Sequence, residues 1–309
     1  MAEMRKVMCE SIIEEMKKND KIVVINSDLG KANGTLPIAD VFPDRLFDAG
    51  VAEQNMAAVA AGMASYGMVP IINSFCAFAT RRICDQAAIS IAYAGQNVKI
   101  IGTDPGITAE LNGGTHMTFE DIAVMRSIPN MVIMEPCDEA ELRQMIAAMC
   151  EYEGPVYMRL YRKVTEPVHG EDYRFRMGKA DVLKEGRDVS VICSGILVQE
   201  ALAAEKELAA KGIDAEIINI HTIKPIDRKA IVDTARKTGV LVTAENHNIL
   251  GGLRSAVAEV VTEESPVKIY PVGVNNLKGE VGKLAYLKEQ FGLTAGAIVA
   301  AAEKAVAGK

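Results

Sequence analysis

The feature that most constrains the fold of this chain is a repeated alternation of short, unbroken apolar runs with longer segments of helical spacing. The run Ile22–Ile25 is β-branched throughout and too short for a buried helix, so it predicts a buried strand. The segment before it, Val7–Met16, has the apolar spacing of one helix face. Buried strands that alternate with helices indicate a mostly parallel sheet covered on both faces, so the sequence predicts an α/β fold.

The alternation occurs in two series, which predicts two three-layer domains with mostly parallel sheets. The predicted strands of the first series are Ile22–Ile25, Val69–Ile72, Val98–Ile101, Met131–Met134 and Val156–Leu160, and those of the second are Val189–Cys193, Ala215–Ile220, Val240–Ala244 and Val267–Tyr270. Predicted helices lie between them, including Ile83–Ala94, and the alanine-rich Ala295–Val306 closes the chain. The segment Val164–Gly178 is charged and aperiodic, as linkers are. We therefore expect domains at residues 1–165 and 179–309, joined by a linker at 166–178.

Charge and composition exclude several classes of function. The formal net charge is −7, and the 34 lysines and arginines are dispersed, so no basic stripe for nucleic acid is expected. Acids interrupt the N-terminal apolar pattern, and no apolar run approaches the roughly 20 residues that span a bilayer. We expect a cytoplasmic protein whose six scattered cysteines are reduced.

Two neighbouring segments combine an acid with aromatic side chains. Glu53 stands at the start of a small-residue helix, where an acid commonly complements the helix dipole. About 20 residues later, Phe75 and Phe78 follow a predicted strand directly, and their spacing could form a wall for a flat ring. Because α/β sheets bind ligands at the carboxyl ends of their strands, the combination predicts a ligand site.

Five motifs, in order along nearly the whole chain, resemble the C-terminal half of transketolase. They are Asn26–Gly30 (NSDLG), Asp48–Asn55 (DAGVAEQN), Ser74–Arg82 (SFCAFATRR), Ile128–Asn130 (IPN) and Thr222–Asp227 (TIKPID). The resemblance implies a thiamine-diphosphate pyrimidine-binding domain followed by a transketolase C-terminal domain. It also implies a transferase of carbohydrate metabolism, which moves a two-carbon ketol unit from a ketose or ketose phosphate to an aldose phosphate.

The resemblance also assigns roles toward the cofactor. Glu53 matches the glutamate that hydrogen-bonds a ring nitrogen of the aminopyrimidine and so favours its imino tautomer, which accepts the thiazolium proton. The other matched cofactor contacts are Phe75 and Phe78, which would stack on the pyrimidine, Leu29 and Val51, which would make apolar contacts, and Asp28, which would make a polar contact.

The glycine-rich loop Gly102–Met117 and Arg162 carry the expected substrate contacts. His116 matches a catalytic histidine at the substrate carbonyl, and Arg162 matches an arginine that binds substrate phosphate. The loop departs from the family pattern: Asp104 stands in place of a substrate-binding histidine, Asn112 in place of an aspartate, and Leu111 in place of a glutamate. Asp104 adds a negative charge, and Asn112 can donate as well as accept. We therefore expect a branched or otherwise modified ketose donor, with xylulose 5-phosphate a poor one.

The GDG motif that holds Mg²⁺ and the diphosphate in this family does not occur in the sequence. The resemblance therefore implies a partner, an N-terminal transketolase-like subunit that holds Mg²⁺ or another divalent cation. The expected assembly is a heterotetramer of two plus two chains.

Other interpretations remain open. Ala52–Gln54 is also similar to 1-deoxyxylulose-5-phosphate synthase and to the β subunit of 2-oxoacid dehydrogenases, whereas Thr115–His116 and Ser127–Asn130 favour transketolase. A subunit without catalytic function that only completes an assembly is the alternative from another class. For His169, His221 and His247 we expect structural or interface roles.

Overall fold

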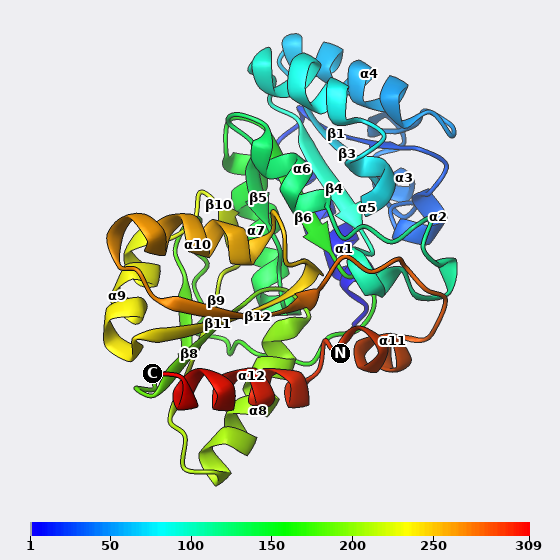
Figure 1. Ribbon diagram of the computed structural model, residues 1–309. Coiled ribbons are helices and arrows are strands. Elements are labelled where there is room, and N and C mark those ends of the chain that lie inside the picture. The colour runs from blue at the N-terminus through cyan, green and yellow to red at the C-terminus, as the bar shows by residue number, and fades with distance from the viewer. Residues whose placement is uncertain (1) are drawn as a thin grey trace.

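The computed structural model describes residues 2–309, and these residues form two sheets (Figure 1). The first sheet has seven strands in the order β10-β5-β6-β4-β3-β1-β2. Its strands are parallel except for β10, which pairs antiparallel with β5. Their bounds are β1 (Ile22–Asn26), β2 (Leu46–Asp48), β3 (Val69–Phe75), β4 (Lys99–Thr103), β5 (Val132–Met134), β6 (Val156–Leu160) and β10 (Thr222–Lys224).

The second sheet has five strands in the order β12-β11-β8-β9-β7. Here β7 is the antiparallel edge strand, and the other pairs are parallel. The bounds are β7 (Asp181–Lys184), β8 (Val189–Cys193), β9 (Ala215–Asn219), β11 (Val240–Asn248) and β12 (Lys268–Val274). Two mostly parallel sheets with flanking helices confirm the predicted fold class.

Helices cover both faces of each sheet. Their bounds are α1 (Met4–Lys18), α2 (Gly30–Asn33), α3 (Ile38–Val41), α4 (Glu53–Ser65), α5 (Cys76–Ala79), α6 (Asp121–Ser127), α7 (Glu139–Glu151), α8 (Leu197–Ala210), α9 (Arg228–Thr238), α10 (Leu253–Glu264), α11 (Leu284–Phe291) and α12 (Ala295–Ala307), with short 3₁₀ helices η1 (Pro43–Arg45) and η3 (Gly106–Asn112). Among residues 2–309, every helix is too short or too polar to cross a membrane.

One segment predicted as an α-helix takes a wider form. Residues Gln86–Tyr93 form the π-helix η2, and the amides of Ala94 and Gln96 donate to carbonyl groups five residues earlier. In an α-helix each amide donates to the carbonyl four residues earlier, and in a π-helix to the carbonyl five residues earlier. Apolar spacing does not distinguish the two, so the sequence predicted only a helix.

The hydrophobic core is continuous between the two halves of the chain. Helices α1 and α7 pack on one face of the first sheet, and α8 and α12 pack on one face of the second. The remaining faces share one cluster of buried side chains, to which α4, η2 and α6 contribute from the first half and α9 and α10 from the second. Figure 1 shows α9 and α10 on the side of the second sheet opposite α8 and α12. The second half is therefore packed against the first through α10 and α6.

Candidate active site

Most of the side chains singled out in the sequence follow the carboxyl ends of five adjacent parallel strands. Asp28 and Leu29 follow β1, Val51 and Glu53 follow β2, Phe75 ends β3 with Phe78 in the helix that follows, Asp104 follows β4, and Arg162 follows β6. Because β6, β4, β3, β1 and β2 are neighbours in this order, these loops meet at one edge of the sheet. This edge is where parallel α/β sheets bind their ligands.

Three rings form an aromatic cluster at this edge. The ring centroids of Phe75 and Phe78 lie 6.2 Å apart, and the imidazole of His116 lies 5.8 Å from Phe75 and 5.1 Å from Phe78. His116 Nδ1 is 2.9 Å from the hydroxyl of Thr115, which fixes the orientation of the imidazole. The structure therefore brings the predicted histidine into contact with both predicted aromatics.

Glu53 starts helix α4 and is buried, with 3% of its surface exposed. Arg82 Nη1 donates a 2.8 Å hydrogen bond to Glu53 Oε2, and the guanidinium carbon of Arg82 lies 4.0 Å from the ring centroid of Phe78. A hollow of 410 Å³ opens beside this pair, lined by residues 51–55 and Arg82. Arg82 thus joins the carboxylate to the aromatic cluster.

No role was predicted for Arg82 from the sequence. The available signal was its place at the end of the aromatic segment Ser74–Arg82. The contact with Glu53 depends on the packing of α4 beside β3, which no motif spacing reveals.

Asp104, which is buried, and Arg162, which is partly exposed, form an ion pair. Arg162 Nε lies 2.7 Å from Asp104 Oδ2, Arg162 Nη1 donates to the carbonyl of Ala32, and the guanidinium carbon is 5.1 Å from the Phe75 centroid. Burial raises the pKa of Asp104 to about 7, although Arg162 opposes the shift. The sequence indicated an added negative charge at Asp104, and the structure places the Arg162 guanidinium directly against it.

The other predicted residues are mostly exposed and, among the described residues, are not bonded to the aromatic cluster. Asp28 is exposed and its amide donates to Asp48, Val51 is 74% exposed, Leu29 is partly buried, and Asn112 is exposed at the end of η3. Within residues 2–309, no hydrogen bond or ion pair joins any of these four to the cluster.

A fully buried polar network supports helix α5. Cys76 Sγ is 2.9 Å from the hydroxyl of Tyr157, which donates to Asp121 Oδ2 at 2.7 Å. Arg159 contacts Asp121 at 2.6 Å and Glu135 at 2.6 Å. Burial opposes ionisation of Asp121, but Arg159, His247 and the Tyr157 hydroxyl together hold the pKa of this carboxyl below its usual range. Cys76 is the first residue of α5, which contains Phe78 and directly follows Phe75. The network therefore fixes the position of both aromatic residues.

The second half of the chain holds the glycine-rich loop in place. Asn246 accepts from the amide of Ile107 at 3.0 Å and donates to the carbonyl of Pro105 at 2.9 Å. Gly106 has φ 53°, and a Cβ there would lie 2.2 Å from Asn246 Oδ1, so only glycine fits. Asn246 thus anchors the loop that carries Asp104, Asn112 and His116.

The donor set suits one end of a charged heteroaromatic ligand. Aromatic side chains beside a buried carboxylate fit a flat ring with a nitrogen to be hydrogen-bonded. Within the described residues, the groups of three or more side chains able to hold a metal ion are Cys137–Asp138–His169 and Glu141–Asp181–His221, and neither includes a residue of this site.

Comparisons with known proteins agree with the arrangement. Residues 1–167 match the model of the transketolase pyrimidine binding domain, and residues 178–298 match that of the transketolase C-terminal domain. A 6-deoxy-6-sulfo-D-fructose transketolase subunit, SqwH, from Clostridium sp. (strain MSTE9) is 49% identical over 97% of this chain and 94% of its own. An apulose-4-phosphate transketolase subunit from Phocaeicola vulgatus is 33% identical over 87% of this chain and 86% of its own. The solved structure of a split gene transketolase, an inactive β4 tetramer, has 42% identity, a TM-score of 0.93 and 99% coverage of both chains.

Proposed function

The chain belongs to the transketolase family, and we propose that it supplies the pyrimidine-binding half of a split, thiamine-diphosphate-dependent transketolase. The observation that carries the proposal is the meeting of Glu53, the aromatic cluster and the Asp104–Arg162 pair at one sheet edge. In this proposal residues 1–165 form the pyrimidine-binding domain, residues 179–309 form the C-terminal domain, and residues 166–178 are the linker between them.

Each part of the site has a separate task. Thiamine diphosphate, when bound, supplies the nucleophilic carbon that attacks the donor ketone. Glu53 hydrogen-bonds the pyrimidine nitrogen and sets the tautomer of the ring, while Arg82 holds the Glu53 carboxylate in position. Phe75 and Phe78 stack on the pyrimidine ring, and His116, which contacts both side chains, hydrogen-bonds the carbonyl of the donor. Leu29, Val51 and Asp28 complete the cofactor contacts when the partner closes the site.

The partner is an N-terminal transketolase-like subunit that holds the diphosphate through Mg²⁺ or another divalent cation. The exposure of Val51 and Asp28 at the site edge supports a surface that another chain covers. The names of two relatives also support a partner chain, because both relatives are called transketolase subunits. The split gene transketolase whose structure resembles this chain is described as an inactive tetramer of β chains, which is consistent with a need for a second type of chain. We propose an active assembly of two plus two chains.

The donor that fits best is a modified ketose with a singly charged terminal anion, whose two-carbon ketol unit is transferred to an aldose phosphate. A phosphate monoester carries about −1.5 to −2 charges at pH 7, whereas a sulfonate carries one. Asp104 offsets part of the charge of Arg162, so the pair offers less positive charge than a free guanidinium would. The 49% identical relative is named for 6-deoxy-6-sulfo-D-fructose, which supports a sulfonated ketose. Asn112 would form a hydrogen bond with a hydroxyl group of the donor.

A donor comparison in the complex reconstituted with the cognate N-terminal subunit tests the proposal. The matched pair is 6-deoxy-6-sulfofructose and fructose 6-phosphate, which share a carbon chain and differ in the anion. We expect kcat/KM to be at least about tenfold higher for the sulfonate, equivalent to about 1.4 kcal/mol. Apulose 4-phosphate and xylulose 5-phosphate complete the series. Equal kcat/KM values for the sulfonate and for fructose 6-phosphate or xylulose 5-phosphate would contradict the proposed donor preference and leave the cofactor assignment standing.

A further inference from the structure

A second cluster of chemically capable side chains lies away from the cofactor site, where the two halves of the chain meet. Glu141 comes from α7 of the first half, His169 from residues 161–180, which form no helix or strand, Asp181 from β7, and His221 from the turn between β9 and β10. The side chains of His169 and His221 are 5% and 1% exposed, and Glu141 is fully buried. The transketolase reaction, as proposed above, uses none of these four residues.

Three buried atoms in this cluster, two of them facing the same Asp181 oxygen, lack hydrogen-bond partners. His169 Nε2 and His221 Nε2 each lie 3.6 Å from Asp181 Oδ2, and none of the three atoms makes a hydrogen bond. Such groups are rare in folded proteins, because each loses its water without gaining a partner. The separation of 3.6 Å is too long for a hydrogen bond but near the roughly 3.3 to 3.4 Å between ligand atoms that each lie ~2.0–2.1 Å from a tetrahedral ion.

Both imidazoles are held in the orientation that metal-binding histidines adopt. His169 Nδ1 lies 3.2 Å from Asp138 Oδ1, and His221 Nδ1 lies 2.9 Å from the hydroxyl of Thr222. Each ring therefore has a partner on Nδ1 and directs Nε2 toward Asp181. In metal-binding histidines, the ring nitrogen that does not bind the metal usually has a hydrogen-bond partner of its own.

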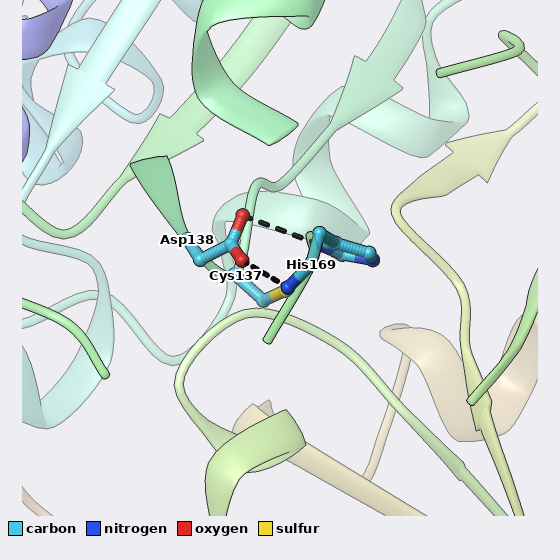
Figure 2. A group of neighbouring side chains, drawn as sticks. All are labelled: Cys137, Asp138 and His169. Atoms are coloured by element: carbon cyan, nitrogen blue, oxygen red, sulfur yellow. Dashed lines mark hydrogen bonds and ion pairs between the residues drawn. The ribbon is translucent and has the colours of Figure 1, made fainter. Parts of the chain in front are cut away.

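Asp138 and Cys137 belong to this support rather than to the ligands. Figure 2 shows the carboxylate of Asp138 and the sulfur of Cys137 beside the His169 imidazole. The Asp138 oxygens already accept from the amides of Glu141, Val168 and His169. The thiol is 3.9 Å from His169 Nδ1, the nitrogen that faces Asp138.

We propose that His169, Asp181 and His221, together with the carboxylate of Glu141, bind one divalent transition-metal ion, with Zn²⁺ the best match. The ligand atoms of Glu141, Asp181 and His221 lie within 4.8 Å of one another. The Glu141 oxygens also accept from the amide of Cys137, the hydroxyl of Tyr173 and the side-chain amide of Asn219, so Glu141 would bind the ion through a remaining lone pair. Two imidazoles and two carboxylates suit Zn²⁺ better than Mg²⁺ or Ca²⁺, which prefer oxygen alone. The Asp181 side chain is 26% exposed, which gives an ion a path of entry.

The ion would tie α7 to the edge of the second sheet and so stabilise the contact between the halves.

Zinc titration of the metal-stripped, full-length chain against a chromophoric chelator, without thiamine diphosphate, tests the site. We expect one equivalent of Zn²⁺ to bind per chain and to raise the melting temperature. Asp181→Asn should weaken binding at least tenfold. Asp172→Asn, the same change at an exposed position of the 161–180 segment, and Cys84→Ser, at an exposed thiol, should leave binding unchanged. Absence of binding by the wild-type chain, or equal binding by Asp181→Asn, would overturn the site.

A spectroscopic measurement on the wild-type chain keeps the test decisive if a variant fails to fold. Co²⁺ in place of Zn²⁺ should give the intense visible absorption of tetrahedral coordination without a thiolate charge-transfer band. A thiolate band would contradict the ligand set, because Cys137 or another thiol would then bind the ion. Because these readouts need neither cofactor nor partner, their failure would leave the transketolase proposal untouched.

Discussion

Replacing Arg159 by Met tests the buried network beneath the aromatic cluster. The guanidinium is fully buried and bonds Asp121 at 2.6 Å, Glu135 at 2.6 Å and the carbonyl of Asn246 at 3.0 Å. Methionine would leave two carboxylates without their cation, and breaking a buried pair in this way costs about 3–5 kcal/mol. At ~2–4 °C per kcal/mol for a chain of this size, the melting temperature should fall by roughly 6 to 20 °C.

The matched control is Arg143→Met. Arg143 is 42% exposed and pairs with Glu10 and Glu139 on the surface, where ion pairs contribute about 0–1 kcal/mol, so its melting temperature should change little. Differential scanning fluorimetry of both variants measures the difference. Equal shifts for the two arginines would refute the argument that the network is a main support of the site.

The effect of pH gives an independent check with a defined sign. The folded-state pKa of Asp121 lies below its usual range, so in the wild type its stabilising contribution is present above the unfolded pKa of about 3.9 and is lost as pH falls through the folded value. In Arg159→Met the Asp121 carboxylate, without this cation, should instead be protonated more readily. The stability gap between variant and wild type should therefore narrow from pH 8 to pH 5, and a widening gap would contradict the reasoning.

Three further predictions concern the site itself. Glu53→Gln keeps the shape of the side chain but removes the acid, so ketol transfer by the reconstituted complex should fall about 10²–10⁴-fold while circular dichroism shows an intact fold; near-normal turnover would mean that another carboxylate is responsible. Phe75→Ala should weaken thiamine diphosphate binding by about 1 kcal/mol beyond the lost buried area, measured by calorimetry of the complex. Burial raises the pKa of Asp104 to about 7, so ionisation of Asp104 above this pH should cancel more of the charge of Arg162 and raise KM for an anionic donor several-fold. Asp104→Asn should remove this dependence of KM on pH. If KM depends on pH in the same way in the variant and the wild type, the Asp104–Arg162 pair is not a donor contact.

The sequence predicted the long buried elements well and the short or exposed ones poorly. Unbroken apolar runs identified the central strands, because burial on both faces demands such runs. The strand β2 was missed because its three residues are half-buried or exposed, and β7 because its burial alternates along an edge. The strand β10 was missed for another reason: it pairs across to β5 of the first sheet, and this pairing depends on how the two halves pack.

At the site, the motifs predicted strand-end loops that the structure places at one edge of the first sheet, but not how their side chains pair. The ion pairs Glu53–Arg82 and Asp104–Arg162 join residues far apart in the chain. The convergence of His169, Asp181 and His221 was equally hidden, since one residue lies in a segment with the composition of a linker. Such pairings depend on side-chain packing, for which spacing alone carries no information. The roles of the site residues in catalysis remain predictions.

The most direct test of the central claim, that this chain is one half of a split transketolase, is a reconstitution assay. Ketol transfer and Mg²⁺-dependent thiamine diphosphate binding would be measured for this chain alone, for the cognate N-terminal subunit alone, and for their mixture, with 6-deoxy-6-sulfofructose and an aldose phosphate as substrates. We predict weak cofactor binding and no turnover for this chain alone, and recovery of both in the mixture. Tight, Mg²⁺-dependent binding of thiamine diphosphate by this chain alone would contradict the claim.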